Sequence, residues 1–191
     1  ATKKKEENIL NLESILFNCR DYLRGSASLN EKRDVILTLV FLRFIGEKFD
    51  DAQGEMRQQC IDHGITDEEK IARFLDSPSR YKNIVYVPEA ARWSMLINVP
   101  TSDLVAALDD ALQAIEDGGD TLKGCVKLGL FTAVKIQPNE LKKVVDEVNK
   151  ISHKVFGEEK DLIGRVYEYF LKSFAVNATK EDGEFYTPHD I

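Results

Sequence analysis

Apolar residues recur every three or four positions along most of this chain, the spacing of one face of an α-helix. The first stripe ends before Gly25 and consists of Ile9, Leu12, Leu16, Cys19 and Leu23. We place Asn30 at the N-cap of the next helix, whose stretch from Val35 to Phe49 is apolar on nearly every side. That pattern predicts a central, buried helix, which continues toward Gly64.

The following segment mixes helix and strand signals. Thr66 and Glu69 have the spacing of a capping box, which predicts a short helix ending near Leu75. Residues 84–87 (Ile-Val-Tyr-Val) are β-branched or aromatic and form the only clear strand candidate, which Pro88 stops.

Helical spacing returns after Pro88 and continues through the rest of the chain. We expect a helix containing Trp93, a second that ends at Gly118, a third that follows Pro138 and a last one that begins at Asp161. Their apolar positions are Trp93 and Leu96; Leu104, Leu108, Ala111 and Ile115; Leu141, Val144, Val145, Val148 and Ile151; and Ile163, Val166, Tyr167, Phe170, Leu171 and Phe174. Residues 122–134 have no clean period, and we expect a loop with a short turn there. The fold class is therefore mainly α, with at most a short strand or hairpin near residues 84–87.

The end of the sequence predicts a second domain. Residues 176–183 have the polar composition of a linker, which leaves residues 1–175 as the helical domain. Thr187 suits a helix N-cap and Pro188 suits the first helical position. The backbone donors of such a helix start would bind a carboxylate or phosphate. The chain stops at Ile191, so we expect a cut at the start of a further domain, residues 184–191.

Composition narrows the possible functions. The formal net charge is −7, which disfavours a free-standing nucleic-acid binder because phosphate neutralisation supplies much of the affinity. No apolar run approaches the roughly 20 residues of a membrane span. The odd number and wide spacing of the cysteines (Cys19, Cys60 and Cys125) predict buried thiols in a reducing cytoplasm.

No local motif for catalysis or metal binding is present in the sequence. The histidines are isolated (His63, His153 and His189), and metal ligation needs several donors that converge. The paired acids favour solvated helix faces, because neighbouring helical residues diverge (Asp50 and Asp51; Asp109 and Asp110). Four glycines weakly suggest a phosphate loop, but no Gly-Lys-Ser/Thr follows them (Gly118, Gly119, Gly124 and Gly129). Trp93 is interpreted as a packing aromatic, although nearby Arg92 and Tyr86 leave base stacking open.

Three strings together resemble a known family. They are Val87-Pro88-Glu89-Ala90-Ala91-Arg92-Trp93, the stretch 161–171 (DLIGRVYEYFL), and Gly183-Glu184-Phe185-Tyr186-Thr187-Pro188. In this order they resemble the N-terminal helical domain of the modification (M) subunit of type I restriction-modification systems, an adenine-N6 DNA methyltransferase. The resemblance runs from Leu12 to the end, and its most specific parts are the last two strings.

The resemblance implies an S-adenosylmethionine-dependent α/β catalytic domain after the helical one. It also implies that the entry segment holds this cofactor through Glu184, Phe185, Tyr186, Thr187, Pro188 and His189. The family's glycine-rich cofactor loop and Asn-Pro-Pro-aromatic motif are absent, and Asn98-Val99-Pro100 is no substitute. We therefore expect these 191 residues to be inactive alone.

The resemblance further implies partners: a specificity subunit, a second modification subunit, a restriction subunit and double-stranded DNA. Four lysines could touch DNA phosphates, although a solvated helix face is the simpler interpretation (Lys142, Lys143, Lys150 and Lys154). Two alternatives stay open. One is a non-enzymatic helical adaptor, and the other is a fused restriction enzyme, which an upstream nuclease domain would mark.

Overall fold

The computed structural model describes residues 2–82, 84–119, 122–124, 126–153 and 155. Within these ranges the chain forms helices joined by turns and loops, and contains no strand, which confirms the mainly α prediction. The longer helices are α1 (Thr2–Tyr22), α2 (Leu29–Asp62), α5 (Leu104–Asp117) and α7 (Pro138–Asn149). The shorter ones are α3 (Glu68–Leu75), α4 (Trp93–Leu96), α6 (Leu130–Val134) and the 3-10 turns η1 (Pro78–Arg80), η2 (Glu89–Ala91) and η3 (Thr101–Asp103).

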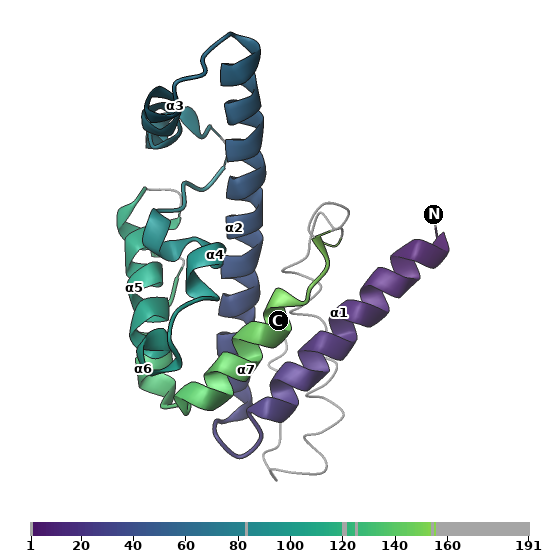
Figure 1. Ribbon diagram of the computed structural model, residues 1–191. Coiled ribbons are helices and arrows are strands. Elements are labelled where there is room, and N and C mark those ends of the chain that lie inside the picture. Colours follow the sequence, from purple (N-terminus) through teal and green to yellow (C-terminus); the bar gives the residue numbers. More distant parts are fainter. Residues whose placement is uncertain (1, 83, 120–121, 125, 154, 156–191) are drawn as a thin grey trace, which may run out of the picture.

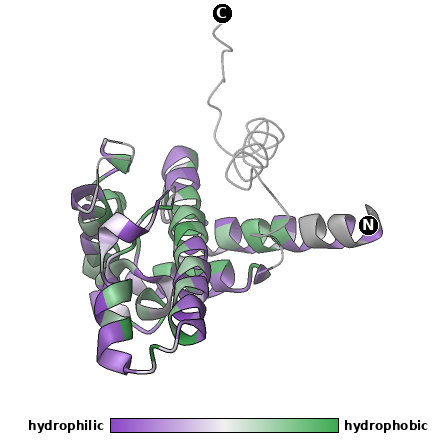
Figure 2. Cartoon of the chain, turned by 90° about the horizontal axis from the view of Figure 1, so that it is seen from above, coloured by the Kyte–Doolittle hydropathy of each residue, from purple (hydrophilic) through white to green (hydrophobic). Residues whose placement is uncertain are grey.

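Helix α2 is the spine of the molecule, and α1, α3, α4, α6 and α7 pack along it, while α5 packs on α4, α6 and α7 (Figure 1). The predicted central stretch from Val35 to Phe49 is buried on several sides, because α1, α4, α6 and α7 all contact it. Helix α1 lies beside α7, and its N-terminal part projects from the body (Figures 1 and 2). Cys19 of α1 and Cys60 of α2 are buried, as predicted.

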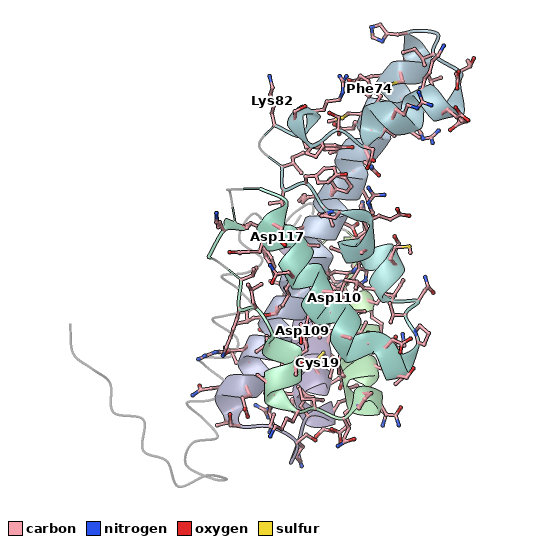
Figure 3. The ribbon with its side chains drawn as sticks, turned by 90° about the vertical axis from the view of Figure 1, so that its left-hand side faces the viewer. Cys19, Phe74, Lys82, Asp109, Asp110 and Asp117 are labelled. Carbon is pink, nitrogen blue, oxygen red and sulfur yellow. The ribbon has the colours of Figure 1, made fainter. Side chains whose placement is uncertain are left out.

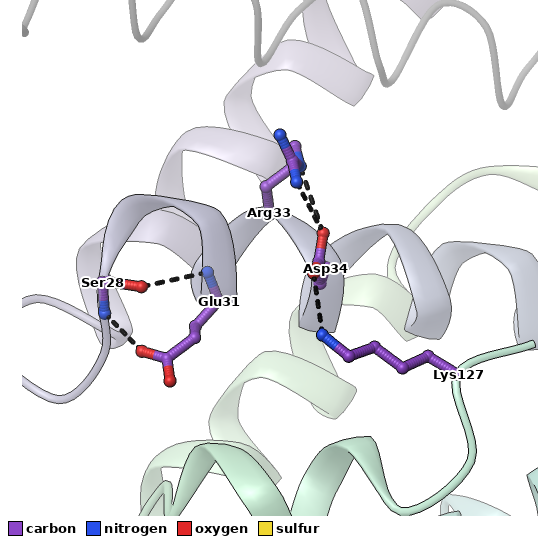
Figure 4. Close-up of polar contacts among 5 residues, drawn as sticks. All are labelled: Ser28, Glu31, Arg33, Asp34 and Lys127. Carbon is purple, nitrogen blue, oxygen red and sulfur yellow. Dashed lines mark hydrogen bonds and ion pairs between the residues drawn. The ribbon is translucent and has the colours of Figure 1, made fainter.

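The N-cap of α2 is Ser28, so the prediction of Asn30 was wrong by two residues. The Ser28 hydroxyl accepts a hydrogen bond from the Glu31 N–H at 3.3 Å, and the Glu31 carboxylate accepts one from the Ser28 N–H at 2.8 Å (Figure 4). This reciprocal capping box satisfies two donors at once, whereas Asn30 lies in the first turn and is exposed.

Helix α3 packs against the far end of α2 and also has a different cap from the one predicted. Asp67, not Thr66, accepts hydrogen bonds from the N–H groups of Glu69 (3.0 Å) and Lys70 (3.3 Å). A small separate core joins the two helices here and consists of Cys60, Ile71 and Leu75, with Met56 and Phe74 at its edge. The predicted end at Leu75 is confirmed.

The predicted strand at residues 84–87 is wrong, since this segment is irregular. Its apolar side chains are packed although the segment pairs with no neighbouring strand among the described residues. Val87 is fully buried, and the ring of Tyr86 meets the ring of Phe49 edge-on, with 5.3 Å between the centroids. The Tyr86 hydroxyl donates to Asp76 at 2.9 Å. A β-rich composition reflects suitability for packing, and here the packing partner is helix α2 instead of a neighbouring strand.

Pro88 is the N-cap of a 3-10 turn, η2, and a separate helix follows this turn. Arg92 is extended (φ −65°, ψ 135°), so the single helix predicted after Pro88 is split and α4 begins at Trp93. Trp93 is 3% exposed, and its Nε1 donates to Asn149 Oδ1 of α7 at 2.9 Å. The packing interpretation of Trp93 is confirmed, because a buried ring cannot stack on a base.

Helix α5 carries the predicted stripe, and α6 is the short turn expected within residues 122–134. Asp109 caps α6, which corrects its assignment to a solvated face. Its carboxylate accepts hydrogen bonds from the N–H groups of Phe131 (3.0 Å) and Thr132 (2.9 Å) and from the Thr132 hydroxyl (2.6 Å). Asp110, labelled beside it in Figure 3, is exposed.

The predicted helix from Asp161, the linker at 176–183 and the domain start at 184–191 lie outside the described residues, as does Cys125. The domain boundaries therefore stay predictions. Among the helices in the described part of the chain, none has both the length and the apolarity needed to cross a membrane.

Candidate nucleic-acid interface

Two sets of site residues were predicted, and the structure describes part of one. The cofactor segment, Glu184, Phe185, Tyr186, Thr187, Pro188 and His189, lies outside the described residues, and so does Lys154. The geometry of Lys142, Lys143 and Lys150 can be examined directly.

Helix α7 positions these lysines through its apolar face. Pro138 occupies the first turn, where a missing N–H has no cost, and Gln137 is extended before it. The face buried against α1, α2 and α5 consists of Leu141, Val144, Val145 and Val148. At 100° per residue, Lys143 and Lys150 share one side of the helix axis, while Lys142 lies on another.

Lys142 is tied to the protein. Its Nζ donates to the Ile97 carbonyl and to Asp146 Oδ1, both at 2.8 Å, and the side chain is 26% exposed. These bonds connect α7 to the end of α4 and satisfy much of the charge. A phosphate could bind only the third N–H donor of this ammonium, beside the Asp146 carboxylate.

Lys143 and Lys150 are exposed. Lys143 Nζ lies 5.9 Å from the ring centroid of Tyr22 on α1, which is itself 36% exposed. Lys150 pairs with Glu147 at 2.6 Å, and the hydrogen bond and negative charge of Glu147 raise the pKa of Lys150 above its usual value. Lys150 is therefore charged at neutral pH. The sequence did not predict that Tyr22 lies near Lys143, because the two residues are far apart in the chain.

The charge of this surface is close to balanced. Helix α7 contains Glu140, Asp146 and Glu147 against Lys142 and Lys143, and Lys150 follows directly. Glu140 is also engaged, since it accepts a hydrogen bond from the Ser26 hydroxyl at 2.5 Å. The described surface of α7 is therefore no broad basic patch, and Lys143 and Lys150 are its exposed cations.

The other polar candidates have local structural partners. His63 Nδ1 lies 2.7 Å from the Gln59 carbonyl, and His153 pairs with Glu47, while His189 is outside the described residues. Asp50 and Asp51 are exposed, in agreement with the solvated-face prediction. Within the described ranges, no three His, Cys, Asp or Glu side chains converge as a metal site would require.

The segment with four glycines, residues 118–129, offers no free phosphate cradle at Gly124 in its described part. Gly124 and Gly129 have positive φ angles of +77° and +68°, which favour glycine. The Gly124 N–H, the kind of donor a phosphate would use, donates to Glu116 Oε1 at 2.7 Å. A carboxylate at this position would also repel an anion.

Comparison with known proteins places this helical architecture in a family. Residues 12–148, which run from the middle of α1 almost to the end of α7, match the family described as the HsdM N-terminal domain. The chain belongs to this family. The predicted resemblance to a type I modification subunit is thereby confirmed. Residues 158–191 also match the family described as N-6 DNA Methylase.

Similar curated proteins are methylase subunits of type I restriction enzymes. The MjaIX subunit of Methanocaldococcus jannaschii is 26% identical over 94% of this chain and 33% of its own length. The MpnII subunit of Mycoplasma pneumoniae is 26% identical over 99% of this chain and 39% of its own length. The HindI subunit of Haemophilus influenzae is 28% identical over 55% of this chain and 28% of its own length. The chain thus spans about a third of the length of these relatives.

Proposed function

We propose that this chain is the N-terminal part of a type I restriction-modification DNA methyltransferase subunit. The intact subunit transfers a methyl group from S-adenosylmethionine to the N6 of adenine in DNA. The observation that carries the proposal is the order of two family matches on one chain: the HsdM N-terminal domain at 12–148, followed by N-6 DNA Methylase at 158–191.

The entry segment supplies the proposed cofactor contacts. Glu184, Phe185, Tyr186, Thr187, Pro188 and His189 fall within the N-6 DNA Methylase match. A helix that starts at Thr187 and Pro188 would present N–H donors and its positive dipole end to the carboxylate of the cofactor. These residues hold the cofactor, and the glycine-rich loop and catalytic motif belong to the rest of the subunit.

The helical domain serves assembly and DNA enclosure in this proposal. The net charge of the 191-residue chain, −7, suits contacts with protein partners, namely the specificity subunit, a second modification subunit and the restriction subunit. Lys143 and Lys150 supply local contacts to DNA phosphates. Lys142 supports them indirectly, because it fixes α7 against α4.

A non-enzymatic helical adaptor is the second candidate. The net charge of −7 favours it, because an acidic surface suits protein partners better than DNA. The methylase match at 158–191 is difficult to reconcile with it, because an adaptor has no need for a cofactor segment.

Cofactor binding distinguishes the two candidates. Equilibrium binding of radiolabelled S-adenosylmethionine would be measured on the intact subunit and on its Tyr186→Ala and Thr187→Ala variants. We expect binding that weakens at least tenfold in both variants and is unchanged in Phe17→Ala, a control at an exposed aromatic on α1. Absence of binding to the intact subunit would favour the adaptor.

A further inference from the structure

Helix α2 carries a row of partly buried apolar side chains. Leu37, Phe41 and Phe44 follow one another at spacings of four and three residues, so they share one face of the helix. Each packs against the main core but is only partly buried, unlike their neighbours Leu39 and Leu42, which are fully buried. Lys48, one turn further, lies over the Phe44 ring at 5.8 Å. We name Leu37, Phe41 and Phe44 the α2 stripe.

The chain leaves the described part of the fold beside this stripe. Arg43 Nη2 donates to the Ile151 carbonyl at 3.3 Å, and His153 Nδ1 pairs with Glu47. Arg43 and Glu47 flank Phe44 along α2, and their own pair at 2.7 Å is nearly buried, with side chains 14% and 12% exposed. These contacts fix residues 151–153 against the turns of α2 that carry the stripe, and Val155 is buried just beyond them.

A segment with a matching apolar row follows shortly afterwards in the sequence. Its apolar residues recur every three or four positions and are Ile163, Val166, Tyr167, Phe170, Leu171 and Phe174. From Val155, the six residues to Asp161 can span about 20 Å. The rise from Leu37 to Phe44 is only about 10 Å. The segment can therefore reach the whole stripe without disturbing the fixed exit.

We propose that residues 161–174 dock on the α2 stripe. An apolar row of this length gains free energy by leaving water, and the stripe is a partly buried apolar row on the turns of α2 that hold the exit. Because the segment belongs to the N-6 DNA Methylase match and α2 to the HsdM N-terminal domain match, the contact is the joint between the two regions. The inference rests on chain geometry and does not depend on the proposed enzymatic activity.

Hydrogen exchange of the 191-residue chain, followed by mass spectrometry, tests this docking. The variant Phe41→Ser removes an apolar contact from the stripe. We expect the amides of 161–174 to exchange at least tenfold faster in Phe41→Ser than in the wild type, with unchanged exchange in α5. The matched control is Phe17→Ser, since Phe17 is a 49% exposed aromatic on α1 and its loss should leave 161–174 unaffected.

Loss of protection in α5 would show that Phe41→Ser disturbs the core, and Leu37→Gln then replaces it in the same comparison. Wild-type exchange of 161–174 at unprotected rates would overturn the proposal. So would equal exchange in the stripe variant and the Phe17→Ser control. Protection of 161–174 that grows with protein concentration would assign the stripe to a second copy of the chain. Neither DNA nor cofactor is present, so failure here is distinguishable from failure of the proposed function.

Discussion

Cys19 shows how a single buried group makes stability depend on pH. Its Sγ lies 3.9 Å from the Val144 carbonyl, and burial, aided by the negative charge of Glu147, raises the pKa of the thiol to about 12. The ordinary value is 9.0, so the folded state keeps a proton that the unfolded state loses between these two values. The resulting stabilisation is complete below pH 9 and is lost as the pH rises toward 12.

We predict that Cys19→Ala reduces this pH dependence. Between pH 8 and pH 10.5 the wild type should lose about 2 kcal/mol more unfolding free energy than the variant, at about 1.4 kcal/mol per pKa unit. Urea unfolding at the two pH values measures the difference, and the titration of lysines and tyrosines cancels because both proteins share them. Equal losses in the two proteins would contradict the account.

Asp109 is the second residue whose importance only the structure reveals. Because its carboxylate accepts three hydrogen bonds at the start of α6, Asp109→Ala should lower the unfolding free energy by about 1–2 kcal/mol. The neighbouring Asp110 is exposed, so Asp110→Ala should change it by less than about 0.5 kcal/mol. Urea denaturation of both variants provides the comparison, and similar effects would argue against the cap.

At the scale of helices, two glycines of α2 predict opposite effects of the same substitution. A Cβ built at Gly46 would lie 3.2 Å from Trp93 Cβ and 3.4 Å from the Trp93 nitrogen, and Trp93 is held in place because it is buried and bonded to Asn149. Gly54 has open space around it in the same helix. We expect Gly46→Ala to destabilise by about 1–3 kcal/mol through overpacking. Gly54→Ala should stabilise by about 0.5–1 kcal/mol through helix propensity. Thermal unfolding of the two variants measures both changes in stability. Stabilisation by Gly46→Ala would contradict the prediction and show that α4 shifts to make room for the methyl group.

The sequence predicted the existence of the helices better than their exact starts. Apolar periodicity reports which face is buried, and that face is visible over ten or more residues. A cap depends on one side chain, and several oxygen-bearing residues near each helix start are able to supply it. The N-cap is Ser28 where Asn30 was predicted, and Asp67 where Thr66 was predicted. The strand at 84–87 failed for a tertiary reason, since its apolar residues pack on Phe49 of α2.

The candidate lysines show the same limit. Periodicity placed Lys142, Lys143 and Lys150 on or beside one helix, but could not show that Lys142 is bound to the Ile97 carbonyl, 45 positions earlier. Nor could it bring Tyr22 beside Lys143. Sequence separation hides contacts of this kind, so the structure alone divides the lysines into anchored and exposed ones.

At the scale of the whole molecule, the account predicts how salt affects DNA binding. The double variant Lys143→Glu, Lys150→Glu in the assembled complex should weaken binding and reduce the magnitude of the slope of log K against log salt by about 2, one for each phosphate contact. The control is Lys70→Glu, an exposed lysine on α3 at the far end of the spine, which should leave the slope unchanged. Fluorescence anisotropy at several salt concentrations measures both. An unchanged slope in the double variant would show that Lys143 and Lys150 do not contact DNA phosphates.

Methyl transfer is the most direct test of the central claim. The intact subunit, combined with its specificity subunit, would be incubated with DNA and tritium-labelled S-adenosylmethionine, and the nucleosides analysed by chromatography. The account predicts label in N6-methyladenine for the complex and none for the 191-residue chain alone. Label in another base, or no label with the intact complex, would contradict the assignment as an adenine-N6 methyltransferase. Label produced by the chain alone would contradict its predicted inactivity.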